Sequence, residues 1–312
     1  MSLQAAEYRA DTFCKIRDYF RERGVLEVET PLMSRGSATD ACIDVFSTLY
    51  KAGSPDSQRL YLQTSPELYM KRMLCRGYPS IFQICRVFRD HEHGRLHNPE
   101  FTMLEWYRLD YNYRRLMRET AELCRLVLGP CPVLEKSYRD VFTGITGLDP
   151  YVSSEQDLTG FIKERAGEEP PFSQKADLLN YITASFIEPA LPPETLSLIF
   201  NYPMELANLA RQDPEEPLAA NRFEAFYNGV ELCNGFEEIT GAEEYKERFL
   251  AENVKRRKAG KRELPLDEKF LKDIRKGLPP CSGAALGLDR LVMLGMGDSD
   301  IASVLEFPID DC

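Results

Sequence analysis

The spacing of apolar positions predicts an ordered series of helices and strands. Apolar side chains recur at helical spacing in residues 4–23, and Gly24 is suited to end that helix. Residues 25–31 (VLEVETP) alternate as a strand does and stop at a proline. Further patterns predict strands at 60–64, 81–88 and 101–107, helices at 113–128 and 242–259, and a strand, turn and helix over 281–296.

The sequence TSPE at residues 64–67 predicts the start of a helix. Ser65 would cap the helix, Pro66 would take its first position, and Glu67 would lie in the first turn. Acids are favoured at this place because of the helix dipole alone. Glu67 therefore allows a purely structural interpretation as well as a functional one.

Residues 130–220 differ from their surroundings, since they carry many prolines and weak periodicity. We interpret them as an insertion with short helices and not as a separate catalytic unit. Residues 222–233 then predict a hairpin, because Asn228-Gly229 is a strong two-residue turn signal. In that register Tyr227 faces Val230, and Phe226 faces Glu231.

Two glutamates on the predicted hairpin are candidates for a metal site. Glu224 and Glu231 are diagonal neighbours on one face, within about 7–8 Å at the backbone. Mg²⁺ commonly bridges such carboxylates to substrate phosphates. A bulge at Gly235 would bring Glu238 to the same face. The alternative is that all three are solvated strand acids.

Residues 86–107 (RVFRDHEHGRLHNPEFTMLEWY) hold three arginines and all three histidines of the chain. Guanidinium groups match phosphate and carboxylate oxygens two at a time, so this segment predicts a site for a polyanion. The chain has no GxxxxGK[ST] and no GxGxxG motif. A cationic loop between two strands would hold a nucleotide triphosphate without them. The histidines could instead bind metal, but no nearby cysteine completes a zinc set.

Two further side chains allow both a functional and a structural interpretation. Arg290 opens an otherwise apolar helix after Gly287, where it needs a partner, and a phosphate at a helix start is one such partner. Phe101 could stack on a base or pack in the core.

Composition narrows the class of protein. The chain has 312 residues and a net charge of −11, so a large nucleic-acid footprint is not expected. Nine cysteines without a CxxC pair predict reduced thiols and a cytoplasmic location. No apolar run is long enough for a membrane span, and the N-terminus has no signal core.

Three segments together resemble the catalytic core of the class II aminoacyl-tRNA synthetases. They are Arg17–Pro31, Phe88–Phe101 and Gly283–Arg290, in the order of that family's three motifs. The stretches HNPEFTMLEWY and ELCNGFEE narrow the resemblance to the lysyl-tRNA synthetase branch. It implies an α+β fold with an antiparallel sheet flanked by helices, one catalytic domain over 1–312 with an insertion at about 130–220, and a homodimer formed through the first motif.

Two features resemble a particular group of paralogues in that branch. Ser65 and Ala285 stand where the synthetases usually have alanine and glycine, and we expect no anticodon-binding domain, because the sequence starts at the first motif. Both features resemble the paralogues that attach (R)-β-lysine to a lysine side chain of elongation factor P. The resemblance implies an ATP-dependent, AMP-forming ligase with (R)-β-lysine or lysine as substrate, elongation factor P as acceptor, and no tRNA or membrane partner.

Two alternatives remain. A truncated lysyl-tRNA synthetase would charge tRNA, and a non-catalytic regulatory paralogue would only bind ligands. Such non-catalytic paralogues tend to lose the nucleotide-binding arginines or the metal carboxylates, whereas Arg89, Arg290, Glu224 and Glu231 are all present.

The resemblance also implies roles for individual residues. Catalytic roles fall to Arg89 and Arg290, and Mg²⁺ binding to Glu224 and Glu231. ATP binding falls to Arg89, Asp90, His91, Asn98, Phe101, Glu231, Leu232, Gly287 and Arg290. Substrate binding falls to Ser65, Pro66, Glu67, Glu105, Tyr107, Asn234, Glu238 and Ala285. His91 departs from the family, which usually has a glutamate at this position.

Overall fold

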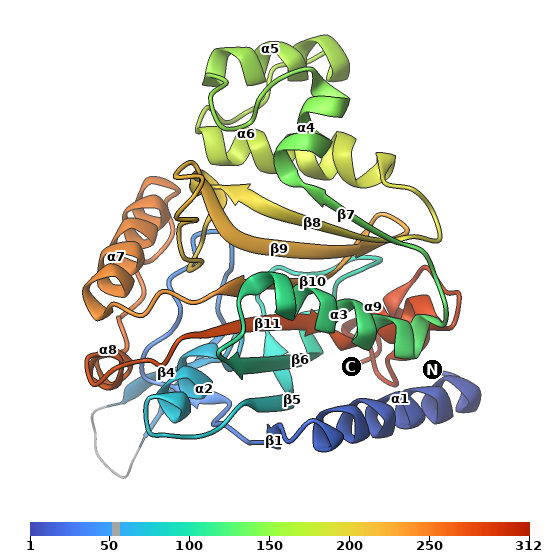
Figure 1. Cartoon of the computed structure of the whole chain (residues 1–312). Coiled ribbons are helices and arrows are strands. Elements are labelled where there is room, and N and C mark those ends of the chain that lie inside the picture. Colours follow the sequence, from blue (N-terminus) through green and yellow to red (C-terminus); the bar gives the residue numbers. More distant parts are fainter. Residues whose placement is uncertain (52–56) are drawn as a thin grey trace.

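The computed structural model describes residues 1–51 and 57–312. In this part of the chain, an eight-stranded sheet runs through the molecule in the order β1-β5-β6-β11-β10-β9-β8-β7 (Figure 1). Only the two outermost pairs, β1–β5 and β7–β8, are parallel. The strands are β1 (Leu26–Glu27), β5 (Ile81–Phe88), β6 (Glu100–Leu109), β7 (Val133–Ser137), β8 (Leu196–Pro203), β9 (Ala219–Tyr227), β10 (Val230–Glu237) and β11 (Cys281–Gly287). A smaller sheet consists of β2 (Met33–Ser34), β3 (Ser47–Tyr50) and β4 (Gln58–Leu62).

Helices α1 (Leu3–Glu22), α3 (Tyr113–Leu128) and α9 (Leu288–Gly295) bury one face of the large sheet (Figure 1). Ser2 and Asn112 cap α1 and α3 by accepting hydrogen bonds from backbone N–H groups three residues on. Phe20 stacks on Phe82 in the core below them. The predicted antiparallel sheet flanked by helices is therefore confirmed.

A second core joins α2 (Glu67–Leu74), α7 (Ala242–Lys258) and α8 (Glu268–Ile274) to the sheet. Tyr245 and Phe249 of α7 pack against Phe270 of α8, and Tyr107 reaches this cluster from β6. This packing fixes α2 and α7 beside the strands that carry the candidate substrate residues.

The segment between β7 and β8 forms a helical layer at the top of Figure 1. It contains α4 (Tyr138–Thr146), α5 (Glu155–Ala166) and α6 (Lys175–Ile182), and it packs on the sheet through Tyr202 and Phe226. Treating 130–220 as an insertion within one domain stays a prediction.

Several predicted boundaries are confirmed, including 81–88 and 113–128. The predicted strand at 25–31 is wrong beyond Glu27, because this edge segment pairs with β5 over two residues only. Pro31 follows, and proline cannot extend a ladder of hydrogen bonds. Among the described residues no helix is both long and apolar enough to span a bilayer.

The hairpin register is confirmed, but the predicted bulge is not. Tyr227 pairs with Val230, and Phe226 pairs with Glu231. The register shifts between Glu231 and Cys233, whereas Gly235 pairs regularly on both sides. Gly235 is small for another reason, because a Cβ there would lie 2.5 Å from the ring of Phe223.

The bulge between Glu231 and Cys233 orients Glu238 in the same way as the predicted bulge at Gly235 would have done. Glu224 lies opposite Asn234, and beyond the bulge every second residue of β10 points to that side. Glu224, Glu231 and Glu238 therefore share one face of the sheet, away from α3.

Candidate active site

A cavity of about 350 Å³ opens on the face of the sheet opposite α3. Strands β6, β10 and β11 form its floor, and α2, α7 and the segment around residue 40 form its walls. The predicted residues that line it are Ser65, Glu67, Arg89, Glu105, Tyr107, Asn234, Glu238 and Ala285. Segments far apart in the sequence thus bring the predicted substrate residues together around one space.

Glu105 is held on the cavity floor by two hydroxyl groups. Ser65 donates a hydrogen bond of 2.6 Å to Oε2, and Tyr107 donates one of 2.7 Å to Oε1. Burial, with the negative charge of Glu67, raises the pKa of Glu105 to about 7. The hydroxyl at position 65 therefore supplies one of two hydrogen bonds that orient this carboxylate, and an alanine would not supply it.

Glu238 lines the cavity and has a fully buried side chain. Its N–H donates to the carbonyl of Cys281, and its Oε2 accepts from the ammonium of Lys71 at 2.5 Å and from Tyr245 at 3.3 Å. Lys71 is also 2.5 Å from Glu67 Oε1, so one ammonium joins both acids. Burial raises the pKa of Glu238 to about 8, and Lys71 opposes this shift.

Two small residues of β11 shape the floor. A Cβ at Gly283 would lie 2.9 Å from Glu238 Oε1 and would also strike the ring of Tyr107, so a larger residue would displace one of these two side chains. Ala285 pairs with Asn234 on one side and with Glu105 on the other. Its methyl group therefore lies between two predicted substrate residues.

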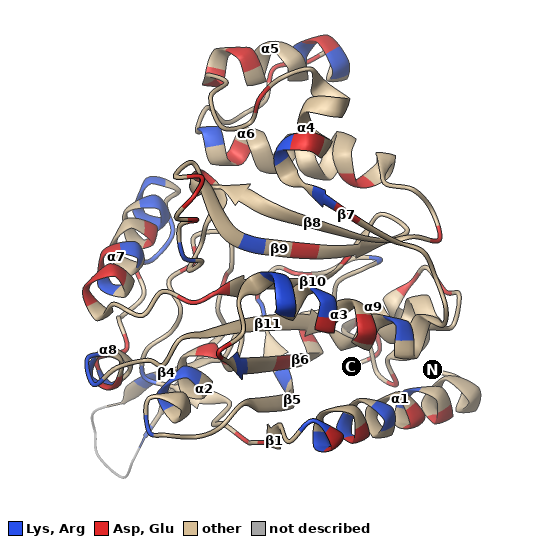
Figure 2. Cartoon of the chain, viewed as in Figure 1, with Lys and Arg blue, Asp and Glu red and all other residues tan. Residues whose placement is uncertain are grey.

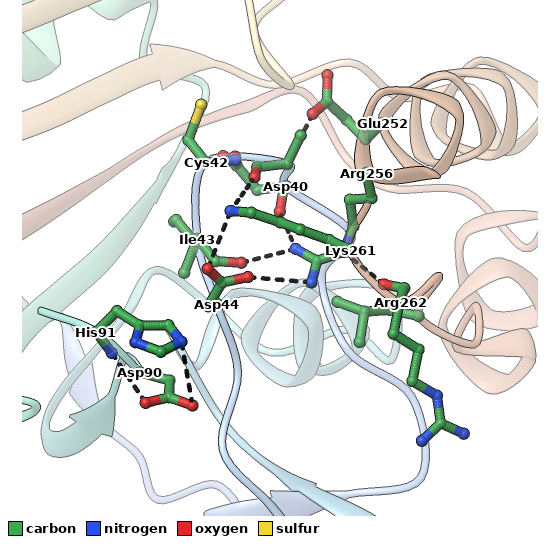
Figure 3. Close-up of polar contacts among 12 residues, drawn as sticks. Asp40, Cys42, Ile43, Asp44, Asp90, His91, Glu252, Arg256, Lys261 and Arg262 are labelled. Carbon is green, nitrogen blue, oxygen red and sulfur yellow. Dashed lines mark hydrogen bonds and ion pairs between the residues drawn. The ribbon is translucent and has the colours of Figure 1, made fainter. Parts of the chain in front are cut away.

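One wall of the cavity is the segment 38–44, which helix α7 and the following loop hold in place (Figure 3). Arg256 donates to the carbonyls of Asp40 and Ile43, each at 2.9 Å, and to the carboxylate of Asp44. Lys261 donates to Asp44 at 2.9 Å. No sequence signal singled out this support, since the basic run 255–262 is typical of a helix end.

Arg89 also lines the cavity, and its side chain is 24% exposed. Its guanidinium lies 5.2 Å from the centre of the Phe101 ring, 3.5 Å from the carbonyl of Thr64 and 3.4 Å from Glu92. Glu92 thus contacts this arginine, whereas His91 has a left-handed backbone (φ 65°) and a side chain that is 80% exposed. The carboxylate of Asp90 accepts a hydrogen bond from the His91 N–H, and the N–H of Asp90 donates to the carbonyl of Asp44.

Arg290 forms a second cationic position. It donates to the carbonyls of Leu96 and Glu231, at 3.1 and 2.9 Å, and lies 2.7 Å from His97 Nε2. Burial and the charge of Arg290 lower the pKa of His97. Gly287, which precedes α9, adjoins the side chain of Arg290.

The hairpin acids Glu224 and Glu231 lie close to arginine side chains and to other carboxylates. Glu224 accepts from Arg222 and, at 2.5 Å, from the hydroxyl of Tyr202. Figure 2 shows one basic and one acidic band along β9, with an uncharged stretch between them. Burial is the main cause that raises the pKa of Glu224 to about 6, and the charge of Glu231 adds to it.

Glu188, from the short turn Glu188–Ala190, adds a third carboxylate that sequence reasoning missed. Burial and the negative charges of Glu231 and Glu224 raise its pKa to about 7. A hard cation such as Mg²⁺ would relieve the mutual repulsion of these acids, although the described residues contain no group of three such side chains already placed to hold one.

Some predicted residues are engaged elsewhere. Asn98 donates to the carbonyl of Glu100 and accepts from the N–H of Ile309, so it fixes the C-terminal segment. Leu232 is the bulged residue, and its side chain lies in the core. Pro66 precedes α2 and is buried. Direct ligand contacts of these three residues stay predictions.

The histidines do not form a common metal site. His91 faces Asp90, His93 lies 3.0 Å from Asp310, and His97 contacts Arg290. Within residues 1–51 and 57–312, no group of three or more His, Cys, Asp or Glu side chains could hold a metal ion. The alternative that the three histidines bind metal is therefore wrong for the described structure.

Comparison with known proteins agrees with this architecture. Residues 2–311 match the family described as tRNA synthetases class II (D, K and N). A protein of Salmonella gallinarum (strain 287/91 / NCTC 13346), named elongation factor P–(R)-beta-lysine ligase, is 41% identical over 305 residues, which cover 97% of this chain and 94% of the relative. Proteins of the same name from Salmonella paratyphi B and Salmonella schwarzengrund are 41% identical over 310 residues, with the same coverage. The chain belongs to the class II tRNA synthetase family of the D, K and N group.

Proposed function

We propose that this protein is an ATP-dependent ligase that activates (R)-β-lysine as an adenylate and transfers it to a lysine side chain of elongation factor P. The single observation that carries the substrate assignment is the cavity itself. Glu67, Glu105 and Glu238 are among the carboxylates that line it, and Arg89 lines it as well. A molecule with two ammonium groups and one carboxylate complements this arrangement. The relatives' printed names supply the acceptor.

In the first step the carboxylate of (R)-β-lysine attacks the α-phosphorus of ATP. An O–P bond forms, the bond to the β-phosphate oxygen breaks, and pyrophosphate leaves. Arg89 lies between the amino-acid cavity and the ring of Phe101, so it can neutralise charge that builds on the α-phosphate. Phe101 and Arg290 hold the adenine between a ring and a guanidinium.

The hairpin acids Glu224 and Glu231 would hold Mg²⁺, with Glu188 close by. A bound Mg²⁺ supplies neutralisation of the phosphate charges. The chain's own contribution at this place is orientation, because Tyr202 and Arg222 fix the Glu224 carboxylate before any ligand arrives.

In the second step the neutral amine of the acceptor lysine attacks the activated carbonyl. A C–N bond forms, AMP leaves, and the amine gives up a proton. A free lysine amine has a pKa of about 10.4, so the site must favour its neutral form.

The proposal also includes a homodimer. Its interface would be formed by Arg17–Pro31, which resembles the first motif of the family.

Pyrophosphate exchange into ATP tests the assignment. (R)-β-lysine should support exchange far better than amino acids with one amine, because unpaired buried carboxylates reject them by about 10⁴–10⁵. Transfer of labelled (R)-β-lysine to elongation factor P should follow, and be lost when the acceptor lysine is replaced by arginine. Efficient charging of tRNA-Lys with lysine, without transfer to the protein, would contradict the proposal.

A further inference from the structure

Lys71 is a fully buried cation behind the wall of the cavity. Its side chain is 0% exposed, whereas Glu67 and Glu238, which it contacts at 2.5 Å each, line the cavity. It lies on α2, one turn after Glu67. Its ammonium is surrounded by three aromatic rings, those of Tyr107, Phe236 and Tyr245, whose centres are 5.8, 5.3 and 5.2 Å away.

A lysine without exposure to water needs strong compensation. Burial disfavours the charged form of Lys71, yet the charges of Glu238 and Glu67 outweigh burial and hold its pKa well above the usual value. The rings add a favourable cation–π contribution. The surroundings of Lys71 therefore favour its charged form.

The two acids retain capacity for a ligand. Glu238 uses Oε2 for Lys71 and Tyr245, whereas its Oε1 is buried and has no hydrogen-bond partner among the described residues. Oε1 lies at the bare backbone of Gly283 on the cavity floor. Glu67 uses Oε1 for Lys71 and is itself part of the wall. An orphaned buried oxygen in a cavity indicates a donor that arrives with the ligand.

The charges match the proposed substrate. Glu67 and Glu238 share the single ammonium group of Lys71, and (R)-β-lysine brings two further ammonium groups to this acidic part of the cavity wall. Without Lys71 the acids Glu67, Glu105 and Glu238 would repel one another more strongly in a desolvated space, and the pKa of Glu238 would rise further.

We infer that Lys71 is a positioning residue for the diamino acid: it holds the carboxylates of Glu67 and Glu238 at a fixed separation, so that each can receive one ammonium group of the substrate. This inference deepens the proposed function and rests on it.

The titration of Glu238 reports on this role. From α2, Lys71 lowers its pKa and Glu67 raises it, and from β6 Glu105 also raises it. The neutral hydroxyl groups of Tyr107 and Tyr245 and the thiol of Cys281 face the same cluster from β6, α7 and β11. Removing the charge of Lys71 should therefore move the ionisation of Glu238 to higher pH. The pH dependence of binding of a diammonium substrate should shift in the same direction.

The test is Lys71→Gln, which keeps a hydrogen-bond donor and removes the charge, assayed by pyrophosphate exchange from pH 6 to pH 9. KM for (R)-β-lysine should rise at least about tenfold while KM for ATP stays unchanged. The rise of kcat/KM with pH should move by about one unit or more toward alkaline pH. Lys71→Arg, which keeps the charge, should retain the wild-type pH profile.

Arg72→Met is the matched control. Arg72 is the next residue on α2, and its guanidinium pairs with Asp273 of α8, away from the cavity. This variant should lower thermal stability and leave the pH profile unchanged. If Lys71→Gln behaves in the same way, or changes neither KM nor the pH profile, the inference is overturned.

A measurement on the wild-type protein covers the case in which Lys71→Gln does not fold. The ¹⁵Nζ resonance of Lys71 should stay that of an ammonium group up to about pH 10 and shift when (R)-β-lysine binds. Titration of this nitrogen below pH 9 would overturn the inference. If instead the wild-type enzyme shows no exchange with any diamino acid, the proposed function fails, and the inference falls with it for that separate reason.

Discussion

The two ends of the site are built differently. At the amino-acid end, Glu105, Glu238 and Lys71 are buried and already bound to fixed partners. At the nucleotide end, Arg89 and Arg290 keep part of their surface in water, and most of their contacts are carbonyl oxygens and partly exposed acids. The charged groups of the amino-acid end are thus buried and fixed by their partners, whereas the arginines of the nucleotide end are partly exposed and less firmly held.

This difference indicates that the amino-acid end determines substrate selectivity and the nucleotide end determines the rate of the chemical step. Buried carboxylates discriminate strongly, because a ligand that lacks an ammonium group leaves them unpaired. Partly exposed arginines discriminate little between nucleotides but can follow charge as it develops on a phosphate. Variants at the two ends should therefore affect different kinetic constants.

The largest effect is expected at the nucleotide end. Arg89→Ala removes the guanidinium beside the reacting phosphate, so kcat for pyrophosphate exchange should fall about 10²–10³-fold. Arg86→Ala is the control, since Arg86 lies on β5 with an exposed side chain, 3.6 Å from Glu100, and should leave kcat unchanged. Equal losses in both variants would show that the strand, and not the charge at position 89, is what matters.

The second effect belongs to the amino-acid end. Glu238→Gln should lower kcat/KM for (R)-β-lysine about a hundredfold, because a buried ammonium loses its carboxylate. In the wild type the pKa of Glu238 is raised to about 8 by burial, and the ionised form binds, so kcat/KM should rise with pH through this region. The variant should lose that rise.

Glu237→Gln provides the comparison for position 238. Glu237 precedes Glu238 and pairs with Arg211 and Asn221 instead of lining the cavity. It should retain both the wild-type kcat/KM and the wild-type pH profile. A pH profile that survives in Glu238→Gln would assign the titration to another group.

The two ends also differ in how far the sequence predicts them. The strand 81–88 and the helix 113–128 were predictable because their apolar periodicity is local and unbroken. The hairpin register followed from Asn228-Gly229, although the bulge was misplaced. Gly235 can serve a bulge or a close contact, and only the ring of Phe223 above it decides between them.

The buried charges could not be predicted in this way. Lys71 lies in ELYMKRML, where a lysine is an ordinary helical residue, and its burial depends on Glu238 and Tyr245, more than 160 residues later. Glu188 was obscured by the weak periodicity of its surroundings. The resemblance to a known family supplied the acids of the site, but their pairing required the folded chain.

A smaller effect tests how the wall of the amino-acid end is held. Arg256 is buried and donates to two carbonyls and a carboxylate of segment 40–44, so Arg256→Met should destabilise the protein by about 2 kcal/mol and raise KM for the amino acid. Chemical denaturation and exchange kinetics measure the two effects. Arg257→Met, next on the helix but exposed, should change neither. An unchanged KM in Arg256→Met would mean that this wall does not contact the substrate.

The smallest effect concerns the choice between α- and β-lysine, which have equal charges and differ in the spacing of their amines. Ala285 lies between Asn234 and Glu105, so its methyl group limits how closely the carbon chain of the substrate can approach the floor of the cavity. Ala285→Gly removes one carbon, worth about 0.8 kcal/mol, and should shift the ratio of kcat/KM for (R)-β-lysine over α-lysine about fourfold toward α-lysine. Ala284→Gly, whose side chain packs in the core on the other face, should lower stability without changing this ratio. If the ratio stays the same in both variants, selectivity resides in the spacing of the acids that Lys71 joins, and the floor plays no part in it.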